Sequence, residues 1–292
     1  MITYVWILLV ILASVYAFIY ISEFIKNRNN LNKNSWWKFI LIGLVTDIGD
    51  TIGIGNFAPT AAVFKLGNLV DDKLIPGTMN AAHCLPVVAE ALIFMTVIEV
   101  EPITLISMLV AAIIGAVVGA GIVSKLNVKT IRLGMGIALF IVAFLLLSDL
   151  MKWMPTGGNA IGLVGGKLIL AIVANFILGA LMTIGIGQYA PCMALVYSLG
   201  MSPKVAFPIM MGSCAFLMPA ASIKFIKSKA VDLKAALGIT IGGIVGVLIA
   251  AYIIKSLPLT VLKWVVLCVL VYTAVTMLKS AFKSKEKAVQ AS

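Results

Sequence analysis

The sequence predicts an all-α polytopic membrane protein with one N-terminal helix and two pseudo-symmetric halves. First, the 292 residues are 62% hydrophobic and 11% charged, whereas about a quarter of the residues of a soluble domain are charged. Second, long apolar runs alternate with short charged stretches, and a helix of about 20 apolar residues satisfies its own backbone hydrogen bonds in lipid. Third, a glycine-rich segment occurs twice, at equivalent places in the two halves.

The N-terminal unit, residues 1–35, consists of an apolar run over 2–25 and a basic loop. The run is longer than a signal-peptide core and has no convincing cleavage site, so we expect it to remain as a transmembrane helix. Because basic residues follow it, its N-terminus is predicted to lie outside the cell. The remaining units are repeat 1 (36–150), a linker (151–161), repeat 2 (162–281) and a basic tail (282–292) expected in the cytoplasm.

Each repeat opens with an interrupted apolar segment, 39–66 in the first and 168–199 in the second. Such a segment could cross the membrane, or it could enter and return as a re-entrant hairpin. Return divides the lysines and arginines more unevenly between the two sides, as the positive-inside rule favours. Three spans would then remain in each repeat, and the repeats would be inverted relative to one another. These spans are predicted over 76–98, 102–123 and 131–147, and over 203–225, 233–254 and 260–278.

The repeated segment reads TIGIGNFAP at 51–59 and TIGIGQYAP at 183–191. Glycines weaken a helix, and proline is tolerated in the first turn of a new one, so each motif predicts the end of one half-helix and the start of another. A helix start offers free N–H groups and a positive dipole end, which attract an anion. Two starts related by pseudo-symmetry would face one another across a single site. The alternative is that both motifs only kink helices for close packing.

We therefore expect a small anion to bind between the two motifs. Backbone amides and two side-chain amides would be the donors, and two aromatic rings would form walls. Three residues of the following spans, Asn80, Ser213 and Cys214, could also face this cavity. The candidate substrate-binding residues are Gly53, Gly55, Asn56, Phe57, Pro59, Asn80, Gly185, Gly187, Gln188, Tyr189, Pro191 and Ser213.

Four ionisable residues at predicted membrane depth occur in the first half only: Asp47, Asp50, His83 and Glu90. Ionisable side chains within a membrane are functional hypotheses by default, and these four could couple transport to protons. The alternative is structural. His83 would then bond a backbone carbonyl, and the two aspartates would bond backbone groups freed by the helix break.

Several other functions find no support in the sequence. The net charge of +11 comes mainly from lysines at the ends of apolar runs, so no nucleic-acid binding is expected. Cys84, Cys192, Cys214 and Cys268 show no metal-ligand spacing, and no metal or other cofactor is expected. The chain has no GxxxxGK[ST] phosphate loop with which to hydrolyse ATP.

The GIG–x–x–x–P element that opens each half, and KFIKSKAVD at 224–232 before a glycine-rich span, resemble the TauE/SafE family of membrane permeases. The resemblance covers about 39–281. It implies a multi-pass bacterial cytoplasmic-membrane carrier, independent of ATP, for a small sulfur-containing or carboxylated anion such as sulfite or a sulfonate. We expect this anion to move by alternating access, and a homodimer is a further expectation. Family members often carry GIGGG where this chain has GIGN and GIGQ, so the particular anion stays open.

Two other functions remain as alternatives. One is a channel-like facilitator for a small solute. The other is a membrane enzyme or sensor that uses His83, Asp50 and Cys84 as a catalytic or metal cluster. A twofold motif has no place in such a cluster, so we favour the transporter over an enzyme.

Overall fold

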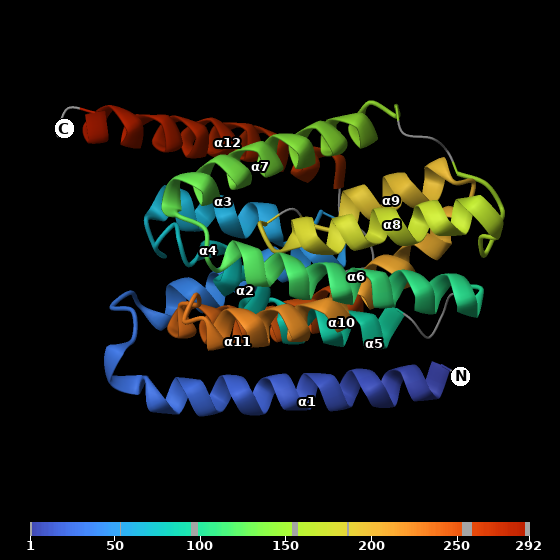
Figure 1. Cartoon of the computed structure of the whole chain (residues 1–292), viewed down its shortest axis with the longest axis horizontal. Coiled ribbons are helices and arrows are strands. Elements are labelled where there is room, and N and C mark those ends of the chain that lie inside the picture. Colours follow the sequence, from blue (N-terminus) through green and yellow to red (C-terminus); the bar gives the residue numbers. More distant parts are fainter. Residues whose placement is uncertain are drawn as a thin grey trace.

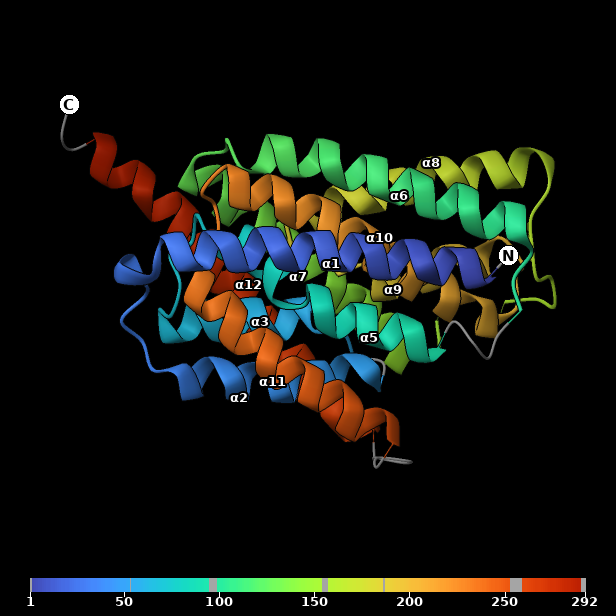
Figure 2. The same cartoon turned by 90° about the horizontal axis from the view of Figure 1, so that it is seen from below.

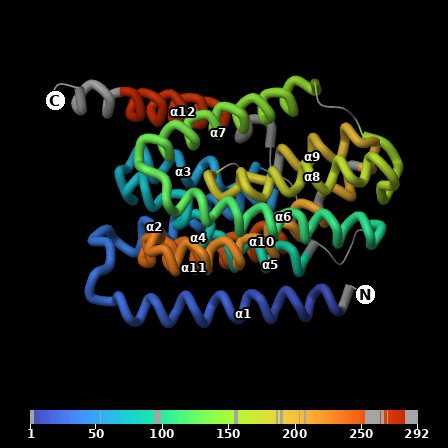
Figure 3. Tube along the Cα trace, viewed as in Figure 1, coloured from blue at the N-terminus to red at the C-terminus, as the bar shows by residue number. Residues whose placement is uncertain are grey.

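A computed structural model describes residues 2–52, 54–94, 99–153, 157–185, 187–252 and 259–289. This part of the chain is helical apart from its loops and one isolated bridge between Ala160 and Met201. The predicted all-α class is therefore confirmed. The helices run along one common direction, with α1 on one flank and α7 with α12 on the opposite flank (Figures 1 and 3). Their bounds are α1 Ile2–Lys26, η1 Arg28–Asn30, α2 Trp36–Thr51, α3 Phe57–Gly67, α4 Ile75–Ala82, α5 Cys84–Phe94, α6 Pro102–Val123, α7 Val128–Leu150, α8 Gly165–Met182, α9 Tyr189–Ser198, α10 Pro203–Lys227, α11 Leu233–Tyr252 and α12 Leu259–Val289.

Six described helices are long and apolar enough to cross a membrane. They comprise α1, α6, α7, α8, α10 and α11, and all of them except α8 match a predicted continuous membrane helix to within three residues at each end. The match follows from uninterrupted apolar composition, which a helix in lipid requires over its whole length. The candidate spans are Tyr4–Lys26, Pro102–Val123, Val128–Leu150, Gly165–Met182, Lys204–Lys227 and Leu233–Tyr252.

The prediction of one continuous span over 76–98 is wrong, because the structure has two helices, α4 and α5, that meet at His83. Pro86 lacks the backbone N–H that would bond the carbonyl of Ala82 one turn earlier. The Thr240 hydroxyl of α11 donates to that carbonyl instead, at 2.7 Å. The break at this point is therefore compensated by a neighbouring helix, as is usual for proline in membrane helices.

Each interrupted segment enters the helix bundle and returns to the end from which it came. At one end, the Asn32 and Asn34 side chains before α2 donate to the carbonyl of Leu69 after α3, at 2.9 and 3.1 Å. At the opposite end, the ammonium of Lys167 in α8 donates to the carbonyl of Leu199 after α9, at 3.3 Å. The α2–α3 and α8–α9 hairpins thus point toward each other from opposite ends (Figures 1 and 2). This is the returning arrangement, not the crossing one.

The two halves contact each other through reciprocal pairs of helices. The helix α2 packs along α11, α8 packs along α6, and α7 packs along α12. A Cβ atom at Gly115 would overlap the carbonyl of Phe176, and one at Gly246 would overlap the carbonyl of Leu44. These glycines stand at equivalent places in the two halves, and small residues let membrane helices approach closely. The same kind of contact therefore joins each hairpin to the other half.

Most basic residues gather at one end of the molecule, where α1, α3, α6 and α10 end and α2, α7 and α11 begin (Figure 1). Asp72 joins two of these elements, because its carboxylate contacts the ammonium of Lys65 at 2.7 Å and the guanidinium of Arg132 at 2.6 Å. The basic residues of this end are Lys26, Arg28, Lys33, Lys38, Lys65, Lys73, Lys125, Lys129, Arg132, Lys224, Lys227, Lys229 and Lys234, whereas Lys152, Lys167 and Lys204 lie at the other.

Candidate functional site

A small cavity lies where the two hairpins meet. Its volume is about 30 Å³, room for roughly one or two water molecules. Residues of both glycine-rich motifs line it together with residues of α2, α5, α8 and α10. The two motifs therefore share one hollow, as predicted. The lining residues are Asp50, Gly55, Asn56, Phe57, Val87, Glu90, Met182, Gly187, Gln188, Met210, Met211 and Cys214.

Two helices begin at this cavity, because α3 and α9 start directly after Asn56 and Gln188. The chain approaches each start through a glycine with a left-handed backbone, Gly55 at φ 87° and Gly185 at φ 112°. Residues with a Cβ rarely adopt such angles, which explains why the motif carries glycine there. The predicted end of one half-helix and start of another is confirmed in both motifs.

The motif prolines lie inside the first turn of the new helices. Pro59 is the third residue of α3 and Pro191 is the third residue of α9, where a missing N–H breaks no intrahelical bond. Gly53 and the side chain of Tyr189 lie outside the described part of the structure. Their predicted roles remain predictions.

The Asn56 amide is held by a buried acid–imidazole pair. Asn56 Nδ2 donates to Oδ1 of Asp47 at 2.8 Å, and the same oxygen contacts Nδ1 of His83 at 2.8 Å. The other imidazole nitrogen, Nε2, lies 2.9 Å from the Thr60 hydroxyl. The side chains of Asp47, Thr60 and His83 are fully buried. Asn56 therefore does not cap α3 with its side chain; the Asp47 carboxylate orients its amide instead. His83 has side-chain partners on both nitrogens, not the backbone carbonyl of the structural alternative.

Two carboxyl groups, those of Asp50 and Glu90, also line the cavity. They lie close enough to interact with each other electrostatically. The Thr51 hydroxyl lies 2.7 Å from Oε1 of Glu90 and also 2.7 Å from the carbonyl oxygen of Asp47. In the described residues neither carboxyl forms an ion pair with a lysine or arginine.

The Gln188 amide is held by a network without ionised groups. Its Nε2 donates to Oδ1 of Asn175 at 2.9 Å, and Asn175 Nδ2 in turn donates to the carbonyl of Met108 at 2.7 Å and to Oγ of Ser213 at 3.0 Å. The thiol of Cys214 lies 3.7 Å from Oε1 of Gln188. The halves thus orient their two cavity amides by different chemistry, an acid–imidazole pair in one and an asparagine in the other. Ser213 supports this network and is not among the residues that line the cavity.

Asn80, the other predicted lining residue of the following spans, is also absent from the cavity wall. Its Nδ2 donates to the carbonyl of Pro76 at 2.9 Å, whereas its Oδ1 is buried without a hydrogen-bond partner in the described structure. Asn80 therefore sits within α4 as a buried, partly satisfied amide.

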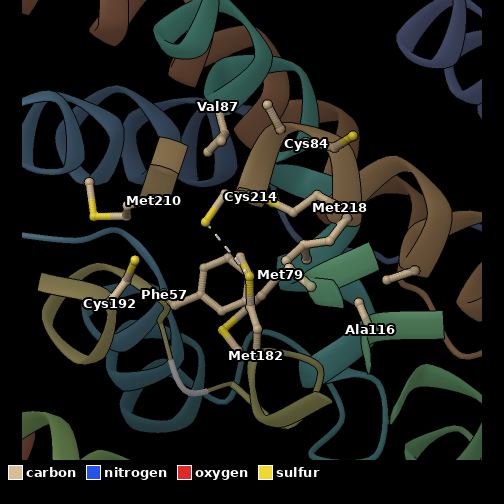
Figure 4. Packing of buried hydrophobic residues seen from close by; sticks show 14 of the residues in the cluster. Phe57, Met79, Cys84, Val87, Ala116, Met182, Cys192, Met210, Cys214 and Met218 are labelled. Carbon is tan, nitrogen blue, oxygen red and sulfur yellow. Dashed lines mark hydrogen bonds between the residues drawn. The ribbon is translucent and has the colours of Figure 1, made fainter. Parts of the chain in front are cut away.

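Sulfur-containing side chains form much of the apolar wall. Met182 and Cys214 lie beside the ring of Phe57 (Figure 4), and the Cys214 sulfur lies 3.9 Å from that of Met182. Met210 also lines the cavity. Sequence reasoning missed the two methionines and also Asn175, which holds Gln188. An asparagine within an apolar helix is a signal for a buried contact, but methionines that line a cavity cannot be told from core methionines without the fold.

The site has no arrangement typical of a metal centre. In the residues that the structure describes, no group of three or more His, Cys, Asp or Glu side chains is placed to hold a metal ion. Cys84 is buried and does not line the cavity. Nothing in this part of the chain therefore favours the alternative cluster of His83, Asp50 and Cys84.

The family model described as sulfite exporter TauE/SafE matches residues 159–292. That region contains the α8–α9 hairpin and α10 to α12, and hence the Gln188 side of the cavity. The predicted resemblance is confirmed over this half of the chain. No curated protein and no solved structure matches the chain.

Proposed function

Because its second half matches the TauE/SafE family, whose members are transporters and not enzymes, we propose that this chain is a secondary transporter for a small sulfur-containing anion such as sulfite or a sulfonate. One observation carries this proposal: two helix starts from opposed hairpins meet at one cavity, each with an amide side chain, Asn56 or Gln188, in its wall. Helix starts favour negative charge, and the effect is stronger where water is excluded.

The opposed hairpins also suggest how the cavity reaches each side of the membrane. Each hairpin separates the cavity from one end of the molecule, so movement of one hairpin would open the cavity to that end alone. At about 30 Å³ the cavity has room for only one or two water molecules, so admission of an anion requires such a movement. The reciprocal helix pairs and the equivalent contacts of Gly115 and Gly246 support inverted repeats over 36–150 and 162–281.

We place the basic end of the molecule in the cytoplasm of a bacterial cell, as the positive-inside rule favours. The helix α1 then begins outside, and α12 runs toward the cytoplasm. The lipid bilayer would surround the bundle. The homodimer stays a prediction, which the mass of the purified protein in detergent would test.

Two measurements test the function. We expect one or more of sulfite, sulfate, thiosulfate, sulfoacetate and methanesulfonate to raise the melting temperature of the purified protein, because a ligand that binds the folded state stabilises it. In proteoliposomes the same anion should show saturable uptake and exchange across the membrane. Flux without saturation would favour the channel-like facilitator, and the absence of both binding and flux would refute the transporter.

A further inference from the structure

We propose that Asp50 and Glu90 bind the proton that travels with the anion, which makes the protein a proton symporter for singly charged oxyanions. This inference rests on the proposed function and assigns its coupling site. Of the four ionisable residues at the centre of the bundle, only Asp50 and Glu90 line the cavity. A proton bound to them would therefore be adjacent to the anion and would reach each side of the membrane by the same route.

The contacts of Glu90 already require a proton on one member of the pair. The Thr51 hydroxyl has a single proton but lies 2.7 Å from two oxygens, those of Glu90 and of the Asp47 carbonyl. With a proton on Glu90 both contacts are hydrogen bonds. Glu90 is almost fully buried, so bulk water does not take the place of the Thr51 hydroxyl as its hydrogen-bond partner.

The electrostatics of the cavity make the anion and the proton bind together. The charged and titratable groups that face the pair are Asp47 from α2, His83 from the α4–α5 break and Cys214 from α10. None of them is a permanent cation. Two negative charges about 4 Å apart repel by an amount that weakens binding roughly a thousandfold at an effective dielectric constant of about 20. An anion therefore enters readily only when the carboxyl pair has taken up its second proton.

This mutual dependence distinguishes symport from antiport. Antiport requires the proton and the anion to exclude one another, whereas here the proton removes the charge that repels the anion. The loaded cavity then carries one anion and one additional proton, which are electrically neutral together. A doubly charged anion would keep an uncompensated charge in a site that has no lysine or arginine partner among the described residues, and burying such a charge is costly.

His83 and Asp47 have a different role in this scheme. Both imidazole nitrogens are occupied, by Asp47 and Thr60, and the ring packs against Phe57 with centroids 5.9 Å apart. The ring is fully buried and does not line the cavity. We assign the two residues as positioning residues that orient the amide of Asn56.

The first test counts protons during binding. Titration calorimetry of the purified protein with methanesulfonate at neutral pH, in two buffers of different protonation enthalpy, should show uptake of about one proton per anion. Sulfate should bind at least tenfold more weakly. Binding of methanesulfonate without proton uptake, or preferential binding of sulfate, would overturn the inference and leave the transporter standing. Absence of binding by either anion would count against both.

The second test follows protons during transport. An inward gradient of methanesulfonate should acidify the interior of proteoliposomes, as reported by an enclosed pH dye, whereas antiport would make the interior alkaline and overturn the inference. The double variant Asp50→Asn with Glu90→Gln keeps both shapes and should move the anion without protons. The variant Asp47→Asn should lower the affinity but keep the proton count. The control Glu101→Gln, at the end of the molecule, should transport the anion with protons at the wild-type ratio.

The proposal stays testable even if a variant fails to fold, because the number of protons taken up per anion is measured on the wild-type protein. Thermal melting identifies a variant that has not folded. If the folded double variant of Asp50 and Glu90 still carries protons with the anion, the assignment of the coupling site is wrong even though symport itself holds.

Discussion

Replacement of Asn56 by leucine tests the anion site by removing the proposed hydrogen-bond donor whose position is best defined. Asn56 Nδ2 donates to the Asp47 carboxylate at 2.8 Å, and the residue forms part of the cavity wall. Leucine has no donor, so Asp47 loses a charge-assisted bond worth about 1.5–3 kcal/mol of folding free energy. Loss of a similar bond to the anion would raise its dissociation constant by roughly 10- to 150-fold, since each 1.4 kcal/mol is about tenfold.

The leucine side chain also adds bulk beside a cavity of only about 30 Å³. Uptake into proteoliposomes should therefore fall by more than the loss of affinity alone, toward the background of empty liposomes. The matched control is Asn127→Leu, which removes another asparagine that precedes a helix. Asn127 lies at the basic end and accepts from the backbone N–H of Thr130 at 2.8 Å. Its loss should cost about 1 kcal/mol of stability and leave uptake per folded molecule unchanged.

The outcome for the pair is decisive because both variants remove one asparagine. Uptake by folded Asn56→Leu at the wild-type rate would refute the position of the anion site. Equal losses in both variants would show that the effect came from general destabilisation. Melting temperatures measured in the same detergent separate these cases.

Two further predictions concern contacts outside the cavity wall. An alanine at Gly243 would overlap the Asp47 carboxylate, so the variant Gly243→Ala should reduce anion uptake at least tenfold. The control Gly121→Ala, where a methyl group has ordinary space, should leave uptake unchanged, and uptake assays on both variants check this. Hydrogen bonds from the Thr104 hydroxyl and from backbone N–H groups lower the pKa of Glu101, which lies at the start of α6. Because the folded-state pKa is depressed, this stabilisation is present above the ordinary pKa of about 4.3 and is lost as the pH falls through the lower folded value. Melting temperatures of wild type and Glu101→Gln should therefore differ at neutral pH and converge in acid; a constant difference would contradict the reasoning.

Sequence reasoning found the helices whose ends have a chemical cause. The span at 102–123 coincides with α6 because a proline opens it and an unbroken apolar run fills it. The two motifs were placed correctly at helix breaks because glycine and proline each restrict the backbone in a known way. Their convergence on one cavity agrees with the expectation drawn from the repeated motif, since equivalent segments of a repeat would lie around a common axis.

The features that sequence reasoning missed depend on partners far away in the chain. The helix break at His83 lies near Pro86, but a membrane helix tolerates proline with or without a break. The Thr240 hydroxyl, which donates to the carbonyl left free at this break, belongs to α11 and is distant in the sequence. The role of Asn175 depends on its distance from Gln188 across a hairpin. The methionine wall has the same composition as a packed core. Such features become visible only when the helices are placed side by side.

Location of a bound anion tests the central claim most directly. Bromomethanesulfonate carries one negative charge and a bromine atom whose anomalous scattering marks its position in a crystal. The two-hairpin site predicts a bromine peak in the cavity between Asn56 and Gln188, with the sulfonate oxygens directed at the starts of α3 and α9. A peak confined to the basic end of the molecule, with an empty cavity at a saturating concentration, would contradict it.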